Sequence, residues 1–260
     1  MVPVLSSDSR DLQVQPLPGV YLEKTDDHVF CRFEHTREVF SSAVLGGGWS
    51  KATQFLNVKV DPHATSYAST PQQTLLDYCA TQNWSGSTIG MMTAASMNSL
   101  RYGIVSAENV NLLILLTSGL ANARRAGDSA ADSSALTRDQ APGTINIAVV
   151  ADARFSEAAM AELMMMTTEA KCAAFQAAGV RSPVSGAIAT GTGTDSVAIF
   201  NGADIHKPAH ETSELQERPL IQYCGKHTHL GEVFARGVIA LLSDSTAEDQ
   251  VLKSSFQESH

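Results

Sequence analysis

The sequence predicts an α/β protein in which a mixed β-sheet is packed between helices. Residues 144–200 follow a strand, helix, strand order that is typical of this class. Residues 112–116 form an unbroken apolar run, which indicates a strand buried on both faces. The helical pattern 156–178 consists mostly of Ala, Met, Leu, Cys and Phe, so we expect this helix to be largely buried as well. A layered α/β/β/α sandwich is one arrangement that these patterns allow.

Taken in order, the elements have recognisable boundaries. Thr70 and Pro71 suit the first positions of a helix, and Gln73 completes a capping box. Ser156 caps the long helix, and Gly179 ends it. Apolar residues recur at helical spacing from Leu230 onward, which predicts a last helix. Strands are expected at residues 28–40, 55–60, 110–117, 144–150, 184–188, 197–200 and 221–223, with surface loops at 128–143 and 203–219.

We expect one domain, at residues 19–245, between a flexible arm at 1–18 and a polar tail at 246–260. The net charge of −9 argues against a nucleic-acid partner, which requires a basic surface. The longest apolar run is far shorter than the roughly 20 residues of a membrane span, so no membrane partner is expected. The four cysteines are widely spaced, which predicts reduced thiols, no zinc site and a cytoplasmic protein. Residues 1–15 carry Asp and Arg and no apolar core, so no signal peptide is expected.

Residues 189–196, Ala-Thr-Gly-Thr-Gly-Thr-Asp-Ser, form the most unusual stretch. They place several hydroxyls and the Asp195 carboxylate on a backbone that glycine leaves free of bulk. One interpretation is an irregular bulge with solvated threonines. The other is a hinge that directs Thr and Asp side chains toward a ligand. A dinucleotide-binding loop is excluded because Ser196 replaces the last glycine and a strand pattern follows instead of a helix.

Other polar residues lie at predicted strand ends and helix starts, where ligand crevices of α/β sheets form. Each also has a structural interpretation. Glu169 shares a helical stripe with Glu162 and Gln176, which is typical of a solvated face, and Glu232 is spaced to pair with Arg236. The candidates are Asn57, Asn122, Asp128, Glu169, Lys171, Thr190–Asp195 and His227–Glu232.

Eight short motifs occur in order along the chain, at residues 41–48, 57, 90–95, 118–128, 143–147, 168–171, 189–195 and 225–232. They are far more specific together than singly. Together they resemble the adenosylcobinamide amidohydrolase family over roughly residues 40–240.

The resemblance implies an enzyme of corrinoid salvage. Such enzymes hydrolyse the amide between the aminopropanol arm and the corrin ring of adenosylcobinamide, giving adenosylcobyric acid and aminopropanol. The implied partner is this small-molecule corrinoid. No protein cofactor or metal is expected, because the cobalt belongs to the substrate. The oligomeric state is left open, and a homo-oligomer is one option.

Amide hydrolysis needs an activated nucleophile and stabilisation of an oxyanion. Asp195 or Glu169 is a candidate base, Lys171 a candidate for holding the oxyanion, and His227 a candidate acid for the leaving amine. Asn122 and backbone amides of the glycine-rich turns are alternative oxyanion donors. The Trp49 and Met91–Met92 regions are candidate apolar walls for a corrinoid. The candidate substrate-binding residues are Asn57, Gly47, Asn122, Asp128, Thr190, Thr192, Thr194 and Glu232.

Two other function classes remain open from the sequence. One is a corrinoid-binding protein without catalysis. The other is an acyltransferase or self-cleaving hydrolase with a threonine nucleophile, because the segments from strand 144–150 to the Thr/Gly stretch faintly resemble ornithine acetyltransferases. That likeness covers about a quarter of the chain, and fold likeness alone does not establish chemistry.

Overall fold

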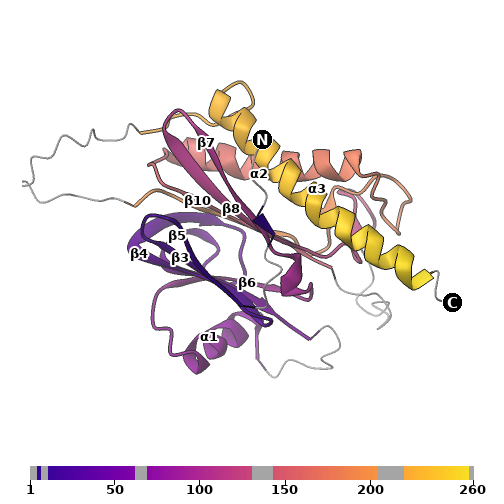
Figure 1. Ribbon diagram of the computed structural model, residues 1–260, viewed down its shortest axis with the longest axis horizontal. Coiled ribbons are helices and arrows are strands. Elements are labelled where there is room, and N and C mark those ends of the chain that lie inside the picture. The colour runs from indigo at the N-terminus through magenta and orange to yellow at the C-terminus, as the bar shows by residue number, and fades with distance from the viewer. Residues whose placement is uncertain (1–4, 7–10, 62–68, 131–142, 204–219, 258–260) are drawn as a thin grey trace, which may run out of the picture.

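The computed structural model describes residues 5–6, 11–61, 69–130, 143–203 and 220–257. Helices α2 (Glu157–Ala177) and α3 (His229–Gln257) cover one side of a mixed β-sheet, and the short helix α1 (Pro71–Thr81) lies on the opposite side of the molecule (Figure 1). The expected α/β class, with mixed sheet between helices, is confirmed. The strands are β1 (Leu5–Ser6), β2 (Leu12–Leu17), β3 (Val20–Lys24), β4 (His28–Ser41), β5 (Gly48–Lys59), β6 (Thr88–Thr93), β7 (Arg101–Ala107), β8 (Val110–Ser118), β10 (Ile145–Ala151) and β12 (Ser196–Phe200).

These strands form two β-layers that are joined through one long strand. The order runs β1-β7-β8-β10-β12-β4-β3-β2, with β5 on β4 and β6 on β5. The last residues of β4 pair with β12, whereas its earlier residues pair with β3 and β5. An irregular register between Arg32 and Arg37 separates the two pairing segments of β4 and β5. The sheet thereby folds over itself, and the chain has four layers in the order α/β/β/α.

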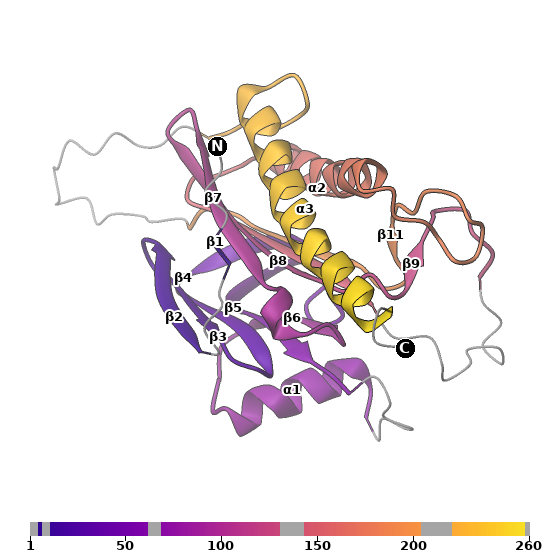
Figure 2. The ribbon, with the colours of Figure 1, turned by 45° about the vertical axis from the view of Figure 1, so that its right-hand side comes forward.

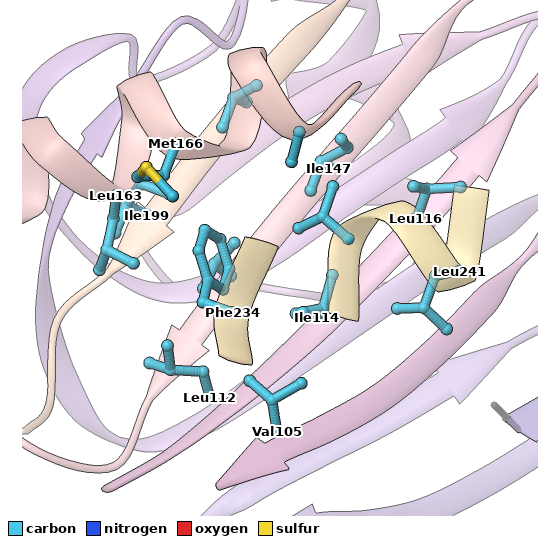
Figure 3. Close-up of a cluster of buried hydrophobic side chains, with 14 of the residues drawn as sticks. Val105, Leu112, Ile114, Leu116, Ile147, Leu163, Met166, Ile199, Phe234 and Leu241 are labelled. Atoms are coloured by element: carbon cyan, nitrogen blue, oxygen red, sulfur yellow. The ribbon is translucent and has the colours of Figure 1, made fainter. Parts of the chain in front are cut away.

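The apolar run in β8 explains why two cores meet at this strand. Leu112, Ile114 and Leu116 pack with α2 and α3 in one cluster, part of which is drawn in Figure 3. Leu113 and Leu115 point the other way and pack against the second β-layer. Successive side chains alternate between the two faces of a strand, so both faces of β8 must be apolar. The prediction of a strand buried on both faces is confirmed.

The predicted helix caps are present. The side chain of Thr70 accepts a hydrogen bond from the backbone N–H of Gln73, and Ser156 accepts one from Ala159. Each bond satisfies a donor that has no partner within its own helix. Gly179 lies just after α2 with a φ of +65°, a conformation in which glycine is favoured.

The structure differs from the expected elements in several places. Residues 221–223 form no strand, only a single bridge between Ile221 and Phe155. Residues 12–17 belong to β2, although the sequence predicts a flexible arm there; their Leu-Gln-Val-Gln alternation is a strand pattern. Residues 184–188 form turns rather than a strand, held by a bridge between Arg181 and Ile188. Helix α3 continues to Gln257 and so includes most of the expected polar tail. The two expected loops lie mostly outside the described residues, since residues 131–142 and 204–219 are not among them.

Candidate active site

The ends of several strands meet at one edge of the sheet. Strands β10 and β12 are parallel, and Asn146 pairs with Ser196 at their first residues. Strand β8 is antiparallel to β10, so its last residue, Ser118, pairs with Ile145 at the start of β10. The segments that follow β8 and precede β10 and β12 are therefore neighbours. The segment after β8 and the segment before β12 also pair with each other. They form a small sheet of β9 (Ala123–Arg124) and β11 (Gly191–Thr192), beside α2 (Figure 2).

Lys171 of α2 and Asp195 form an ion pair at this edge. The Lys171 Nζ and Asp195 Oδ2 atoms are 2.5 Å apart, and the side chains are only 9% and 12% exposed. Asp195 Oδ2 also accepts a hydrogen bond from the backbone N–H of Thr192, at 3.0 Å. Its Oδ1 accepts bonds from the N–H of Ile145, at 3.0 Å, and from the Thr192 hydroxyl. The carboxylate thus ties α2, the Thr/Gly stretch and the start of β10 together.

This arrangement limits the chemistry of Asp195. All of its partners among the described residues are donors, and they occupy both carboxylate oxygens. The carboxylate would have to give up one of these bonds to act as a base. The geometry therefore favours a positioning role for Asp195, which is one of the alternatives that the sequence left open. Gly191 has no room for a side chain here, because an added Cβ would collide with Asp195 and lie 2.8 Å from Lys171 Nζ.

Two threonine hydroxyls meet next to this ion pair. The Oγ1 atoms of Thr144 and Thr194 are 2.7 Å apart, and either can donate the hydrogen bond. Thr144 is buried, whereas Thr194 is exposed. Thr144 was not among the residues predicted from the sequence. A signal was available, because Gly143–Thr144 precedes one strand as Gly193–Thr194 precedes another.

Asn122 lies against both of these glycines. Its backbone nitrogen is 2.9 Å from the position that a Cβ on Gly143 would take, and the nitrogen of Ala121 is 2.8 Å from the same position. The Asn122 Nδ2 atom is 2.7 Å from the corresponding position on Gly193. Glycine is therefore required at residue 143, where the neighbouring atoms belong to the backbone, whereas at residue 193 the neighbour is the end of a side chain. The structure brings Asn122 and Thr194, both predicted site residues, next to Thr144.

A chain of buried amides connects the site to the second β-layer. Asn57 of β5 donates a hydrogen bond to the hydroxyl of Thr117 and accepts one from Asn146 Nδ2, each at 2.8 Å. Asn146 also donates to the carbonyl of Met92, at 3.0 Å. Asn146 Oδ1 is buried and has no hydrogen-bond partner among the described residues. Asn57 thus lies in the interior, where it links β5 to β8 and β10.

Other predicted residues lie on the surface around α2 and the start of α3. Glu169 pairs with Lys226 rather than with Lys171, and the two side chains are 44% and 69% exposed. Glu232 pairs with Arg236, as its spacing indicated, and lies 3.7 Å from His229. His227 is exposed. These residues do not join the Lys171–Asp195 network.

Asp128 and Thr190 support the small β9–β11 sheet. Asp128 accepts hydrogen bonds from the N–H of Arg125 and the hydroxyl of Ser182, and bonds from Ser182 and Ser185 hold the pKa of Asp128 below its usual value. The Thr190 hydroxyl accepts a bond from the N–H of Ala126. Their present contacts are therefore structural.

Of the predicted apolar walls, Trp49 is available and Met91 is not. Trp49 is half exposed and stacks on Phe40, with ring centroids 4.5 Å apart. Met91 is buried in the core between the β-layers. Gly47 lies in a tight turn, where a Cβ would be 2.5 Å from the carbonyl oxygen of Ala43. Within the described part of the chain, no group of three or more His, Cys, Asp or Glu side chains could hold a metal ion.

Residues 18–253 match the model of a family of amide hydrolases. The family is that of the adenosylcobinamide amidohydrolases (CbiZ), and the chain belongs to it. The chain is also 28% identical over 162 residues to an uncharacterised protein of Methanocaldococcus jannaschii, a match that covers 57% of this chain and 58% of the relative's length.

Three solved structures are similar to the chain at low sequence identity. The L-aminopeptidase D-Ala-esterase/amidase of Ochrobactrum anthropi, described as a variant of the Ntn hydrolase fold, has a TM-score of 0.38 and 10% identity, over 89% of this chain and 80% of its own. The PH0078 protein of Pyrococcus horikoshii OT3 has a TM-score of 0.40 and 11% identity, over 93% and 83%. A β-aminopeptidase of Burkholderia sp. has a TM-score of 0.36 and 12% identity, over 92% and 81%.

Across the described helices, none is both long and apolar enough to cross a membrane.

Proposed function

We propose that the protein hydrolyses the amide that joins the aminopropanol arm to the corrin ring of adenosylcobinamide. The products are adenosylcobyric acid and aminopropanol, and the acid re-enters coenzyme B12 synthesis in the cytoplasm. The cobalt enters as part of the substrate, and the residues of the site need no metal of their own for this reaction.

The proposal is supported by the positions that the family motifs take in the structure. Four segments that the family resemblance singled out contribute Asn122, Thr144, Lys171 and Asp195 to one edge of the sheet. The first and last of these residues, Asn122 and Asp195, are 73 positions apart along the chain (195 − 122). They supply hydroxyl groups and amide donors, which attack on an amide carbonyl requires, and an ion pair that fixes the start of β10.

The direct test is the release of aminopropanol by the purified full-length chain. The protein is incubated with adenosylcobinamide in the dark, and both products are quantified by chromatography and mass spectrometry. We expect one aminopropanol for each adenosylcobyric acid, and multiple turnovers per chain without added metal. Prior treatment with a chelator should leave the rate unchanged, and a rate restored only by zinc or manganese would contradict the metal-free reaction.

The same samples distinguish catalysis from simple binding. A corrinoid-binding protein would retain adenosylcobinamide in equilibrium dialysis and release no aminopropanol. That outcome would refute the proposed function. The matched control is the Lys171→Met variant, which removes the buried cation of the site while leaving the surface Glu169–Lys226 pair in place. We expect Lys171→Met to reduce turnover strongly.

A further inference from the structure

The surroundings of the Thr144–Thr194 pair suit a reactive hydroxyl more than a structural one. Each threonine follows a glycine that lies against the segment after β8: Gly143 against backbone atoms of residues 119–122, and Gly193 against the Asn122 side chain. The Thr144 hydroxyl is within hydrogen-bond distance of one described side chain, that of Thr194. Because Thr194 is exposed, the pair extends from the buried start of β10 to the surface of the protein.

Two backbone nitrogens of the segment after β8 lie close to Gly143, the residue before Thr144. The N–H groups of Ala121 and Asn122 make no hydrogen bond to any described residue, although both nitrogens lie against Gly143. The Asn122 Nδ2 group, which lies against Gly193, also has no partner among the described residues. Ala121 is exposed and Asn122 is half-buried, so these donors are open to solvent and available to a ligand. Donors grouped in this way stabilise the negative oxygen of a tetrahedral intermediate.

We propose that Thr144 Oγ1 is the nucleophile of the reaction, with the amide groups of Ala121 and Asn122 as the oxyanion donors. This inference rests on the proposed function and deepens it. Thr144 Oγ1 attacks the substrate carbonyl carbon, and the Oγ1–C bond forms as the carbonyl π bond moves its electron pair onto oxygen. Thr144 gives its proton to Thr194 Oγ1, and Thr194 passes its own proton to the amide nitrogen.

The C–N bond then breaks, and aminopropanol leaves as an amine. The corrinoid acyl group remains on Thr144 as an ester. Water attacks this ester, one water proton returns through Thr194 to Thr144 Oγ1, and the carboxylic acid leaves. Both steps balance without a redox partner or a metal.

The other hydroxyls of the site are less suited to attack. The Thr192 hydroxyl donates to Asp195 Oδ1, and the Thr117 hydroxyl accepts from Asn57. Asp195 also accepts the N–H of Ile145, the residue that follows Thr144, so the Lys171–Asp195 pair fixes the start of β10. Lys171 and Asp195 act through this contact as positioning residues.

The test compares Thr144→Ala and Thr144→Ser with wild type in the aminopropanol assay. Thr144→Ala should lose on the order of 10³-fold or more in turnover, and Thr144→Ser should retain turnover because it keeps the hydroxyl. Thr167→Ala is the matched control, since Thr167 is also a buried threonine but its hydroxyl bonds only within α2. We expect the control to stay within about fivefold of wild type, because its hydroxyl has no role in nucleophilic attack.

Two covalent readouts separate a nucleophile from a structural hydroxyl. Hydroxylamine added during turnover should convert part of the product to the corrinoid hydroxamate, because it competes with water for the ester. Diisopropyl fluorophosphate should label Thr144, with formation of the Oγ1–P bond and loss of fluoride, and peptide mass spectrometry locates the label. This second probe needs no corrinoid substrate.

The outcomes keep the two proposals apart. Labelling of Thr144 in a wild-type chain that releases no aminopropanol would refute the proposed function and still support a nucleophilic Thr144. Thr144→Ala turnover within tenfold of wild type would overturn the inference and leave the proposed function intact. Loss of turnover in Thr144→Ala without a hydroxamate and without a label on Thr144 would also overturn it.

Discussion

Replacing Asp195 with asparagine should destabilise the fold strongly, because both carboxylate oxygens receive only donors. Asparagine keeps the shape of the side chain but turns one oxygen into an NH₂ group. If the NH₂ group takes the place of Oδ2, it faces Lys171 Nζ and the N–H of Thr192. If the NH₂ group takes the place of Oδ1, it faces the N–H of Ile145 and the Thr192 hydroxyl. In either orientation, donors meet donors, and Lys171 loses its negative partner.

The magnitude follows from burial. Removal of one partner from a buried ion pair costs about 3–5 kcal/mol. The Lys171 and Asp195 side chains retain 9% and 12% exposure, so we take the lower end, about 3 kcal/mol. At about 2–4 °C per kcal/mol for a chain of this size class, the melting temperature should fall by about 6–12 °C.

A matched surface pair provides the control. Glu169 and Lys226 are also 2.5 Å apart, but their side chains are 44% and 69% exposed. Glu169→Gln should therefore change stability by less than about 0.5 kcal/mol. Differential scanning calorimetry of both variants, with urea unfolding of each, measures the contrast.

A double-mutant cycle tests whether the cost arises from the pair itself. The Asp195→Asn and Lys171→Met changes together should cost less than the sum of the single changes by about 1–3 kcal/mol, since the second change removes the unpaired cation. Additive costs, or an Asp195→Asn variant that melts like wild type, would refute this reasoning.

Four further variants test other parts of the structure. Gly143→Ala should lower stability by about 1–3 kcal/mol, because its Cβ would collide with the backbone carbonyl of Gly119. The Cβ of Gly193→Ala would meet only a side chain, so this variant should lower turnover with a smaller shift in melting temperature. Asn57→Leu should cost about 2 kcal/mol or more in urea unfolding, because it breaks the buried amide chain between the β-layers. Burial raises the pKa of Cys224 to about 12, so above pH 9 the native thiol stays protonated while the thiol of the unfolded chain ionises. The free energy of unfolding should therefore fall with rising pH, by up to about 1.4 kcal/mol per pH unit. The Cys224→Ala variant should show a smaller slope.

Much of the fold could be predicted because local patterns and tertiary packing agree. The run at residues 112–116 is apolar on both sides because α2 and α3 cover one face of β8 and the second β-layer covers the other. The caps at Thr70 and Ser156 act within a single turn of backbone. Residues 12–17 were missed because glutamine and proline make this short strand resemble a polar arm, and its pairing with β3 is a tertiary feature.

The site was predicted only in part, since the sequence locates polar residues but not their partners. Glu169 and Lys171 are two positions apart on one helix, so they point in different directions. Lys171 faces Asp195, and Glu169 faces Lys226 at the surface. Thr144 was overlooked because a threonine at the start of an apolar strand is unremarkable until its hydroxyl is seen beside Thr194.

Strand direction determines which of these residues can meet. Ligand crevices of doubly wound sheets lie at the carboxyl ends of parallel strands. Here β10 and β12 contribute their amino ends, and β8, which is antiparallel to β10, contributes its carboxyl end. If β8 ran parallel to β10, the Ala121–Asn122 segment would leave the sheet at the opposite edge from Thr144. The antiparallel pairing of Ser118 with Ile145 therefore places the amide groups of Ala121 and Asn122 against Gly143, the residue before Thr144. This pairing is a property of the sheet that no single motif in the sequence contains.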